Sequence, residues 1–172
     1  LASLGAHVVL AARKEAKLAK TAAEINESGG KASFYTMNIR CEDEVERVIE
    51  QIVQDHGTID GLVNNAGGQF PSPAEKISQK GWHAVVETNL TGTFLVSRAV
   101  FNQVMSKKGG SVVNIVAEMW RGFPGMAHTG AARAGVVNLT KTLAVEWAAR
   151  GVRINSVAPG IIEGHGLTQY DP

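Results

Sequence analysis

The stretch GFPGMAHTGAARAGVVNLTKTLAVEWA, at residues 122–148, carries the strongest structural signal in the chain. A loop broken by glycine and proline runs into a long helical pattern, in which Val136, Leu139, Leu143 and Trp147 mark one apolar face. Most of the other positions carry small apolar side chains, which is typical of a helix buried on two sides. We therefore expect one side of this helix to pack against a sheet and the other against a second subunit.

Two polar residues stand near the start of this helix. Thr129 and Arg133 are four positions apart, so their side chains share a face. We expect this pair to lie where chemistry takes place.

The composition indicates one domain over residues 1–172, because 44% of the chain is hydrophobic and can supply a core. The net charge of +1 gives no electrostatic reason to expect nucleic acid or a membrane surface as a partner. No apolar run approaches the ~18 residues that a membrane span needs. The single Cys41 excludes an internal disulfide bond and suits a reducing compartment. The five histidines lack the spacing of metal ligands, so no metal site is expected.

Strand-like and helix-like patterns alternate along the chain. Short apolar runs predict strands at residues 6–12, 31–37, 59–64, 111–116 and 152–158. Longer patterned runs predict helices at residues 13–28, 42–55, 79–105 and 129–148, with a short helical piece at 72–78. This alternation is typical of an α/β fold with a parallel sheet and helices on both faces.

In such sheets, ligands lie beyond the carboxyl ends of the strands. The segments that follow the predicted strands should therefore converge on one crevice; they are residues 12–13, 38, 65–67, 116–117 and 159–160. After the third strand, Asn64-Asn65-Ala66-Gly67 offers small residues that let the backbone approach a flat ring, and asparagines that can hold neighbouring strand ends. An ordinary turn is the competing interpretation. Asn89, followed by Gly92 inside a helix, can leave a carbonyl free to hold water, or can be a capping or surface residue.

Taken in order, the stretches at residues 64–67, 87–92, 122–148 and 155–160 resemble the short-chain dehydrogenase/reductase family. The resemblance implies a Rossmann-type three-layer parallel sheet and a bound nicotinamide dinucleotide. Residues 67–94 and 122–147 are most similar to the family's trans-2-enoyl-CoA reductases of peroxisomes and bacteria.

The chain departs from the family pattern at both ends of its sequence. The family's N-terminal strand with its glycine-rich phosphate loop is missing, and so is the last strand. By resemblance, the missing N-terminal strand belongs between the predicted strands at residues 6–12 and 59–64. We therefore expect this chain to be a fragment of a longer protein.

The chain also departs from the family in its catalytic residues. By resemblance, Thr129 occupies the position of the usual tyrosine and Arg133 that of the usual lysine. The serine position falls on Val116, or on Ala117 if the loop is one residue shorter. Asn89 matches the catalytic asparagine of the family and is the one such residue retained.

These substitutions favour one chemistry over another. Reducing a ketone needs a proton donor for the alkoxide, and neither a threonine hydroxyl nor an arginine can serve. Reducing an enoyl thioester places charge on the thioester oxygen, which hydrogen-bond donors stabilise. Thr129, with Arg133 behind it, suits that role. The α-carbon proton can come from water or from a nearby acid, for which His128, Glu118 and Tyr170 are the candidates, although His128 is expected in a loop.

The expected cofactor is NADP(H). No acid ends the second expected strand of the family pattern, and Arg13 can pair with a 2′-phosphate there or simply be solvated at a helix start. The resemblance implies further contacts along the dinucleotide. Asn38 and Ile39 flank the adenine; Asn65, Ala66 and Gly67 line the nicotinamide ribose; Arg133 holds that ribose; and Pro159, Gly160 and Ile162 cap the nicotinamide.

The expected function is NADPH-dependent reduction of trans-2-enoyl-CoA to saturated acyl-CoA. Two alternatives remain, a catalytically silent nucleotide-binding or scaffold protein and a ketoreductase with displaced catalytic residues. The expected partners are an acyl-CoA substrate and further copies of the chain in a homodimer or homotetramer. The expected location is the cytoplasm, or the peroxisome in a eukaryote.

Overall fold

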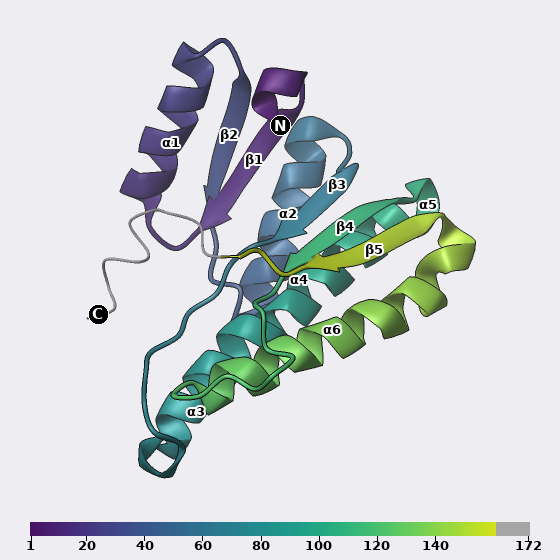
Figure 1. Ribbon diagram of the computed structural model, residues 1–172. Helices are drawn as coiled ribbons and strands as arrows, with labels where there is room; N and C mark the ends of the chain where they lie inside the picture. Colours follow the sequence, from purple (N-terminus) through teal and green to yellow (C-terminus); the bar gives the residue numbers. More distant parts are fainter. Residues whose placement is uncertain (161–172) are drawn as a thin grey trace.

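The computed structural model describes residues 1–160, which form an α/β fold with parallel strands (Figure 1). The strands are β1 (His7–Ala12), β2 (Lys31–Thr36), β3 (Gly61–Asn64), β4 (Gly110–Ile115) and β5 (Val152–Val157). The helices are α1 (Glu15–Glu27), α2 (Glu42–His56), α3 (Gln79–Val86), α4 (Gly92–Val100), α5 (Ser106–Lys108) and α6 (Ala127–Trp147). The predicted strands and helices are confirmed, with shifts of a few residues at their ends.

The strands form two sheets, because β1 and β3 are not hydrogen-bonded to each other. One sheet has the order β1-β2 and the other the order β3-β4-β5. The gap between the two sheets lies where the sequence predicts a missing central strand. Val63, on the β3 edge, is 50% exposed. The predicted fold class, a Rossmann-type parallel sheet that lacks this strand, is confirmed.

Helices lie on both faces of the β1-β2 sheet. Val9 and Ala11 pack against the core that α2 and α4 help to build, whereas Leu10 lies beside Leu18 and Thr21 of α1. Because side chains alternate between the faces of a strand, α1 and α2 cover opposite faces (Figure 1).

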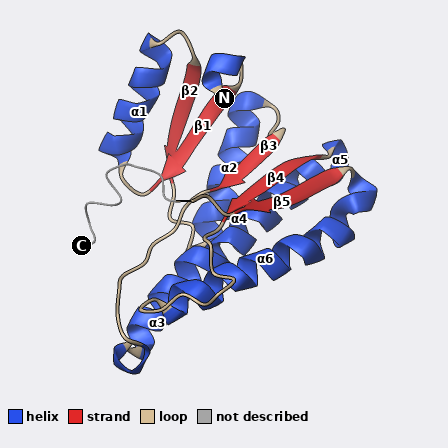
Figure 2. Cartoon of the chain, in the orientation of Figure 1, coloured by secondary structure: helices blue, strands red, loops and turns tan. Residues whose placement is uncertain are grey.

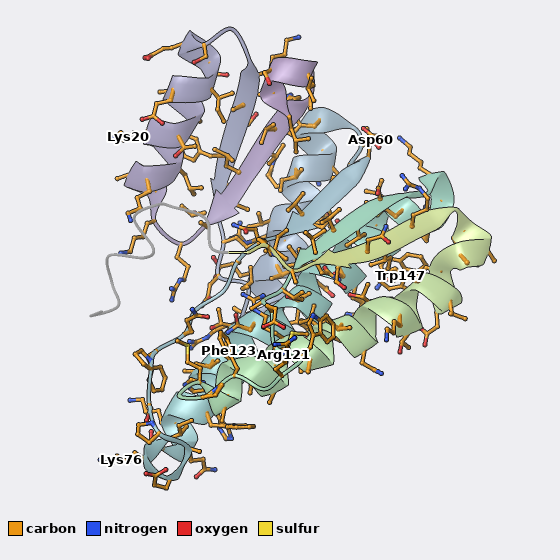
Figure 3. All side chains as sticks on the ribbon, viewed as in Figure 1. Lys20, Asp60, Lys76, Arg121, Phe123 and Trp147 are labelled. Carbon is orange, nitrogen blue, oxygen red and sulfur yellow. The ribbon has the colours of Figure 1, made fainter. Side chains whose placement is uncertain are left out.

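The main core lies between the β3-β4-β5 sheet and the helices α2, α4 and α6. Leu62, Val112 and Ile154 are neighbours in the strand register and all point into this core. At its far end Trp147 of α6 stacks on Phe101, with ring centroids 4.1 Å apart (Figure 3). The prediction that one side of α6 packs against a sheet is confirmed.

The opposite side of α6 is open along a stripe of small residues, namely Ala131, Ala134, Asn138, Thr142 and Val145. Val145 is 80% exposed. A second subunit on this stripe stays a prediction. No helix within residues 1–160 is both long and apolar enough to cross a membrane.

The long predicted helix at residues 79–105 is continuous but irregular. Two π-helical turns, Glu87–Thr91 and Phe101–Met105, interrupt it. At the first turn the Gly92 N–H donates to the Glu87 carbonyl, one residue further back than in an α-helix. The long helix is therefore irregular around Asn89. The predicted free carbonyl is wrong, because the Thr93 hydroxyl donates to the Asn89 carbonyl at 2.9 Å.

Candidate active site

Two loops meet at the N-terminal end of α6. One follows β3 and the other follows β4, and Figure 2 shows both running beside the start of α6. The Ser72 N–H of the first loop donates to the Gly125 carbonyl of the second at 2.7 Å. Gly125 has a φ of 73°, a conformation that favours glycine at this turn. Phe123 packs against Gly130, where an added Cβ would lie 3.0 Å from the Phe123 Cβ (Figure 3).

Gly67 lies between Asn89 and Arg133. A Cβ at Gly67 would overlap the Arg133 guanidinium and would lie 2.8 Å from Asn89 Oδ1. These three residues come from the loop after β3, the long helix and α6. The structure thus brings together three of the residues that the sequence nominated.

Asn89 is fully buried and holds the loop after β3. Its Nδ2 donates to the carbonyls of Gly68 at 2.6 Å and Val85 at 2.8 Å. Its Oδ1 accepts from the Gly68 N–H at 3.4 Å. Asn89 is therefore a capping residue for the loop rather than a surface asparagine.

Arg133 is 9% exposed and is hydrogen-bonded to the end of β4. Its Nη1 donates to the Ile115 carbonyl at 2.7 Å, which leaves the rest of the guanidinium beside Gly67. Burial lowers the pKa of Arg133. The guanidinium still carries its charge near neutral pH, because its ordinary pKa is so high.

Thr129 shares the buried side of α6 with Arg133, as predicted, and is fully buried. Its N–H donates to His128 Nδ1 at 2.8 Å, and its Oγ1 lies 3.3 Å from the same nitrogen. The expectation that His128 lies in a loop is wrong. His128 belongs to the first turn of α6 and is fully buried, with Phe70 against its ring.

The end of β4 carries no hydroxyl at the predicted serine position. Val116 is buried in a small apolar cluster with Met119, Val136 and Val137. Ala117 is half-buried, and Glu118 is exposed.

The asparagines of the strand ends form a buried polar bridge, as the sequence suggested for Asn64. Asn64 Nδ2 donates to Asn114 Oδ1 at 2.8 Å and to Ser97 Oγ at 2.9 Å. Asn114 Nδ2 in turn donates to the Thr140 hydroxyl at 2.9 Å. These bonds fix β3, β4, α4 and α6 relative to one another and so position the loops of the site.

Arg13 lies in a separate basic pocket at the carboxyl end of β1. Lys14 and Lys17 line the same pocket. Sequence reasoning missed Lys17, although it stands four positions after Arg13 at helical spacing. No hydrogen bond or ion pair in the described part of the chain joins Arg13 to Asn89 or Arg133.

The other predicted cofactor residues lie at strand ends but make few contacts. Asn38 and Ile39 follow β2: Asn38 Oδ1 accepts from the Arg40 N–H at 3.2 Å, and Ile39 packs against Gly92. The remaining predicted residues divide by exposure: Asn65, Ala66 and Gly160 are exposed, and Pro159 is half-buried. Ile162 and Tyr170 lie outside the described residues. Within residues 1–160 no group of three His, Cys, Asp or Glu side chains could hold a metal ion.

The chain matches a known protein family over almost its whole length. The model of the family described as short chain dehydrogenase matches residues 1–171. A solved structure of citronellol catabolism dehydrogenase (AtuB) from Pseudomonas aeruginosa is 58% identical, with a TM-score of 0.90, over 92% of this chain and 65% of that one.

Two curated relatives differ in their named reactions. The "Probable 2,4-dienoyl-CoA reductase [(2E)-enoyl-CoA-producing]" of Bacillus subtilis is 40% identical over 96% of this chain and 66% of its own length. The 3-oxoacyl-[acyl-carrier-protein] reductase of Synechocystis is 43% identical over 81% of this chain and 57% of its own length. This chain therefore spans less than two thirds of the length of these relatives.

Proposed function

The chain belongs to the short-chain dehydrogenase family, and we propose that the complete protein reduces the double bond of trans-2-enoyl-CoA with NADPH. The proposal covers activity, substrate and cofactor alike. It rests on the side chains at the start of α6.

The observation that carries the proposal is the absence of a phenol from this site within residues 1–160. The only tyrosine there, Tyr35, lies on β2 and donates to Asp55 at 2.6 Å. The start of α6 instead offers Thr129, a weak acid, and Arg133, which does not give up its proton. The site thus supplies hydrogen-bond donors and positive charge, but no group that would protonate an alkoxide.

Such a site suits an enoyl thioester. When bound, NADPH supplies a hydride to the β-carbon of the substrate, and water supplies the proton that the α-carbon later takes up. The negative charge that develops on the thioester oxygen then needs donors, and losing one such donor typically costs ~3 kcal/mol of transition-state stabilisation. A donor at the start of α6, Thr129 or its neighbour His128, would bond this oxygen, and Arg133 would hold the nicotinamide ribose.

The residues present fit a nicotinamide dinucleotide in two places. Gly67 lets the Arg133 guanidinium, which would hold the nicotinamide ribose, lie close against its backbone. At the other end, Arg13 shares its pocket with Lys14 and Lys17. Three cations in one pocket support a 2′-phosphate, and hence NADPH rather than NADH. Asn38 and Ile39 would flank the adenine, Asn65 and Ala66 the nicotinamide ribose, and Pro159, Gly160 and Ile162 the nicotinamide.

A 2,4-dienoyl-CoA is a second candidate substrate, which the named reaction of the Bacillus subtilis relative favours. Conjugation carries the charge of a reduced diene to the same thioester oxygen, so the same donors would act. Ketone reduction is the competing activity, which the name of the Synechocystis relative favours. A silent binding protein is the remaining alternative.

We also propose that these residues act within a longer protein. An added strand between β1 and β3 would join the two sheets and cover the exposed edge at Val63. The open stripe on α6 would then face a second copy of the protein in a homodimer or homotetramer. A cooperative unfolding transition of residues 1–172 alone would contradict the first of these proposals.

A substrate panel tests the function. The complete protein is mixed with NADPH and, in turn, trans-2-hexenoyl-CoA, 2,4-hexadienoyl-CoA and 3-oxohexanoyl-CoA, while the absorbance of NADPH is followed. Turnover with the first two substrates supports the proposal. Turnover with the 3-oxo substrate alone identifies a ketoreductase, and NADPH binding without any turnover identifies the silent protein.

A further inference from the structure

His128 carries a buried donor that has no partner among residues 1–160. Within residues 1–160 only two buried side-chain polar atoms lack a hydrogen bond, His128 Nε2 and Thr58 Oγ1. Thr58 lies between α2 and β3, whereas His128 precedes Thr129 in the first turn of α6. The imidazole is fully buried.

The contacts of His128 decide where its ring hydrogen lies. The Thr129 N–H donates to Nδ1 at 2.8 Å, so Nδ1 carries a lone pair and the neutral ring has its hydrogen on Nε2. An imidazolium would set a second N–H against the N–H of Thr129. The ring therefore offers its Nε2–H as a hydrogen-bond donor.

An unpaired buried donor is costly, because it has given up its hydrogen bonds to water without a replacement. Buried polar groups in native proteins are almost always paired, so an exception in a candidate site points to a partner that binds there. The partner must be an acceptor, because Nε2 offers a hydrogen.

Phe70 packs against the His128 ring and is itself partly exposed to solvent. Its ring meets the His128 ring edge-on, with centroids 4.5 Å apart, and it is 39% exposed. The loop that carries Phe70 is held on either side, at Gly68 by Asn89 and at Ser72 by Gly125. A shift of the Phe70 ring would therefore uncover His128 without dismantling the loop.

We propose that the hydrogen-bond donor to the thioester oxygen of the substrate is His128 Nε2–H, because the Thr129 hydroxyl lies beside the other ring nitrogen, 3.3 Å from Nδ1. The acyl-CoA displaces the Phe70 ring, and its thioester oxygen accepts from Nε2 as charge develops there. His128 would then be a catalytic residue that forms no covalent bond and transfers no proton. This inference rests on the proposed function, because it needs an acyl thioester at the site.

The test compares His128→Leu with His128→Gln, since glutamine keeps an N–H donor and leucine does not. His83→Leu is the matched control, because His83 is an exposed histidine on α3. The probe is 2,4-hexadienoyl-CoA bound with NADP⁺, whose near-ultraviolet band moves to longer wavelength when its thioester oxygen accepts hydrogen bonds. NADPH affinity reports on folding.

We expect His128→Leu to lose most of the band shift and about 100-fold in kcat, with KM changed little, as for other oxyanion donors. We expect His128→Gln to retain much of both and His83→Leu to retain all. Wild-type levels of shift and kcat in His128→Leu would overturn the inference while leaving the proposed function intact. A wild-type protein that neither binds nor turns over the dienoyl-CoA would instead overturn the proposed function.

A second measurement needs no stable variant. In protein with ¹⁵N-labelled histidine, the Nε2–H proton of His128 should move downfield when the dienoyl-CoA and NADP⁺ bind. An unchanged resonance in the presence of bound dienoyl-CoA would overturn the inference, whether or not His128→Leu folds.

Discussion

Asn89 and Gly68 are joined by two hydrogen bonds, one donated by each residue. The Asn89 amide donates to the Gly68 carbonyl at 2.6 Å and accepts from the Gly68 N–H at 3.4 Å. A side chain on the long helix thereby fixes the loop that follows β3. Asn89 therefore has a structural role, because its hydrogen bonds to the loop keep Gly67 beside Arg133.

Asn89→Asp tests this link. A carboxylate cannot donate to the carbonyls of Gly68 and Val85 and would face both oxygens without a partner. We expect the free energy of unfolding to fall by ~2 kcal/mol or more, because the site is fully buried. Urea unfolding measures the change. Asn102→Asp, at an exposed position of the same long helix, should change stability little.

Gly67→Ala tests the position of the Arg133 guanidinium, which would hold the nicotinamide ribose. The added methyl would overlap the Arg133 guanidinium, so we expect NADPH to bind at least about 10-fold more weakly, as when a positioning contact worth ~1.4 kcal/mol is lost. Gly68→Ala is the control, because its Cβ would meet only the Thr88 methyl, at 4.0 Å. Fluorescence titration with NADPH gives both affinities, and equal affinities would contradict the assignment.

Arg13→Ala tests the choice of cofactor. A charge-assisted hydrogen bond contributes ~1.5–3 kcal/mol, so we expect KM for NADPH to rise about 10-fold or more and KM for NADH to stay unchanged. Arg47→Ala, on the exposed side of α2, controls for the loss of one positive charge. A parallel rise for both cofactors would show that Arg13 does not recognise the 2′-phosphate.

Tyr35→Phe tests a polar cluster away from the site. Burial and the hydrogen bond to Asp55 raise the pKa of Tyr35 to about 12, from an ordinary 10.0. The same hydrogen bond lowers the pKa of Asp55 below its ordinary 3.8. Tyr35 thus contributes stability that is complete below pH 10.0 and is lost as the pH rises towards 12. The contribution of Asp55 is complete above pH 3.8 and is lost at lower pH.

The stability difference between the wild type and Tyr35→Phe should therefore be flat between about pH 5 and pH 9 and shrink on either side. Thermal unfolding across this range measures it in the complete protein. A difference that grows above pH 10.0 would contradict the assigned hydrogen bond.

Much of the fold could be predicted from local patterns. Apolar runs and glycine breaks place the strands, and helical spacing places Thr129 and Arg133 on one face of α6. The break between β1 and β3 could be predicted by resemblance, because the family pattern supplies a strand there. These features depend on residues close together in sequence or on the order of motifs.

What could not be predicted depends on contacts between distant segments. The burial of His128 depends on Phe70, which a different loop brings to it. The bonded carbonyl of Asn89 depends on the rotamer of Thr93, which the sequence pattern does not specify. Lys17 joins Arg13 only because α1 begins where it does.

The central claim is that hydride goes to a carbon–carbon double bond. The most direct measurement gives the complete protein equal amounts of trans-2-hexenoyl-CoA and 3-oxohexanoyl-CoA with NADPH deuterated at the transferred position, and locates the deuterium by mass spectrometry. The account predicts deuterium on the β-carbon of hexanoyl-CoA. Deuterium on the carbinol carbon of 3-hydroxyhexanoyl-CoA, with hexenoyl-CoA left unchanged, would contradict it.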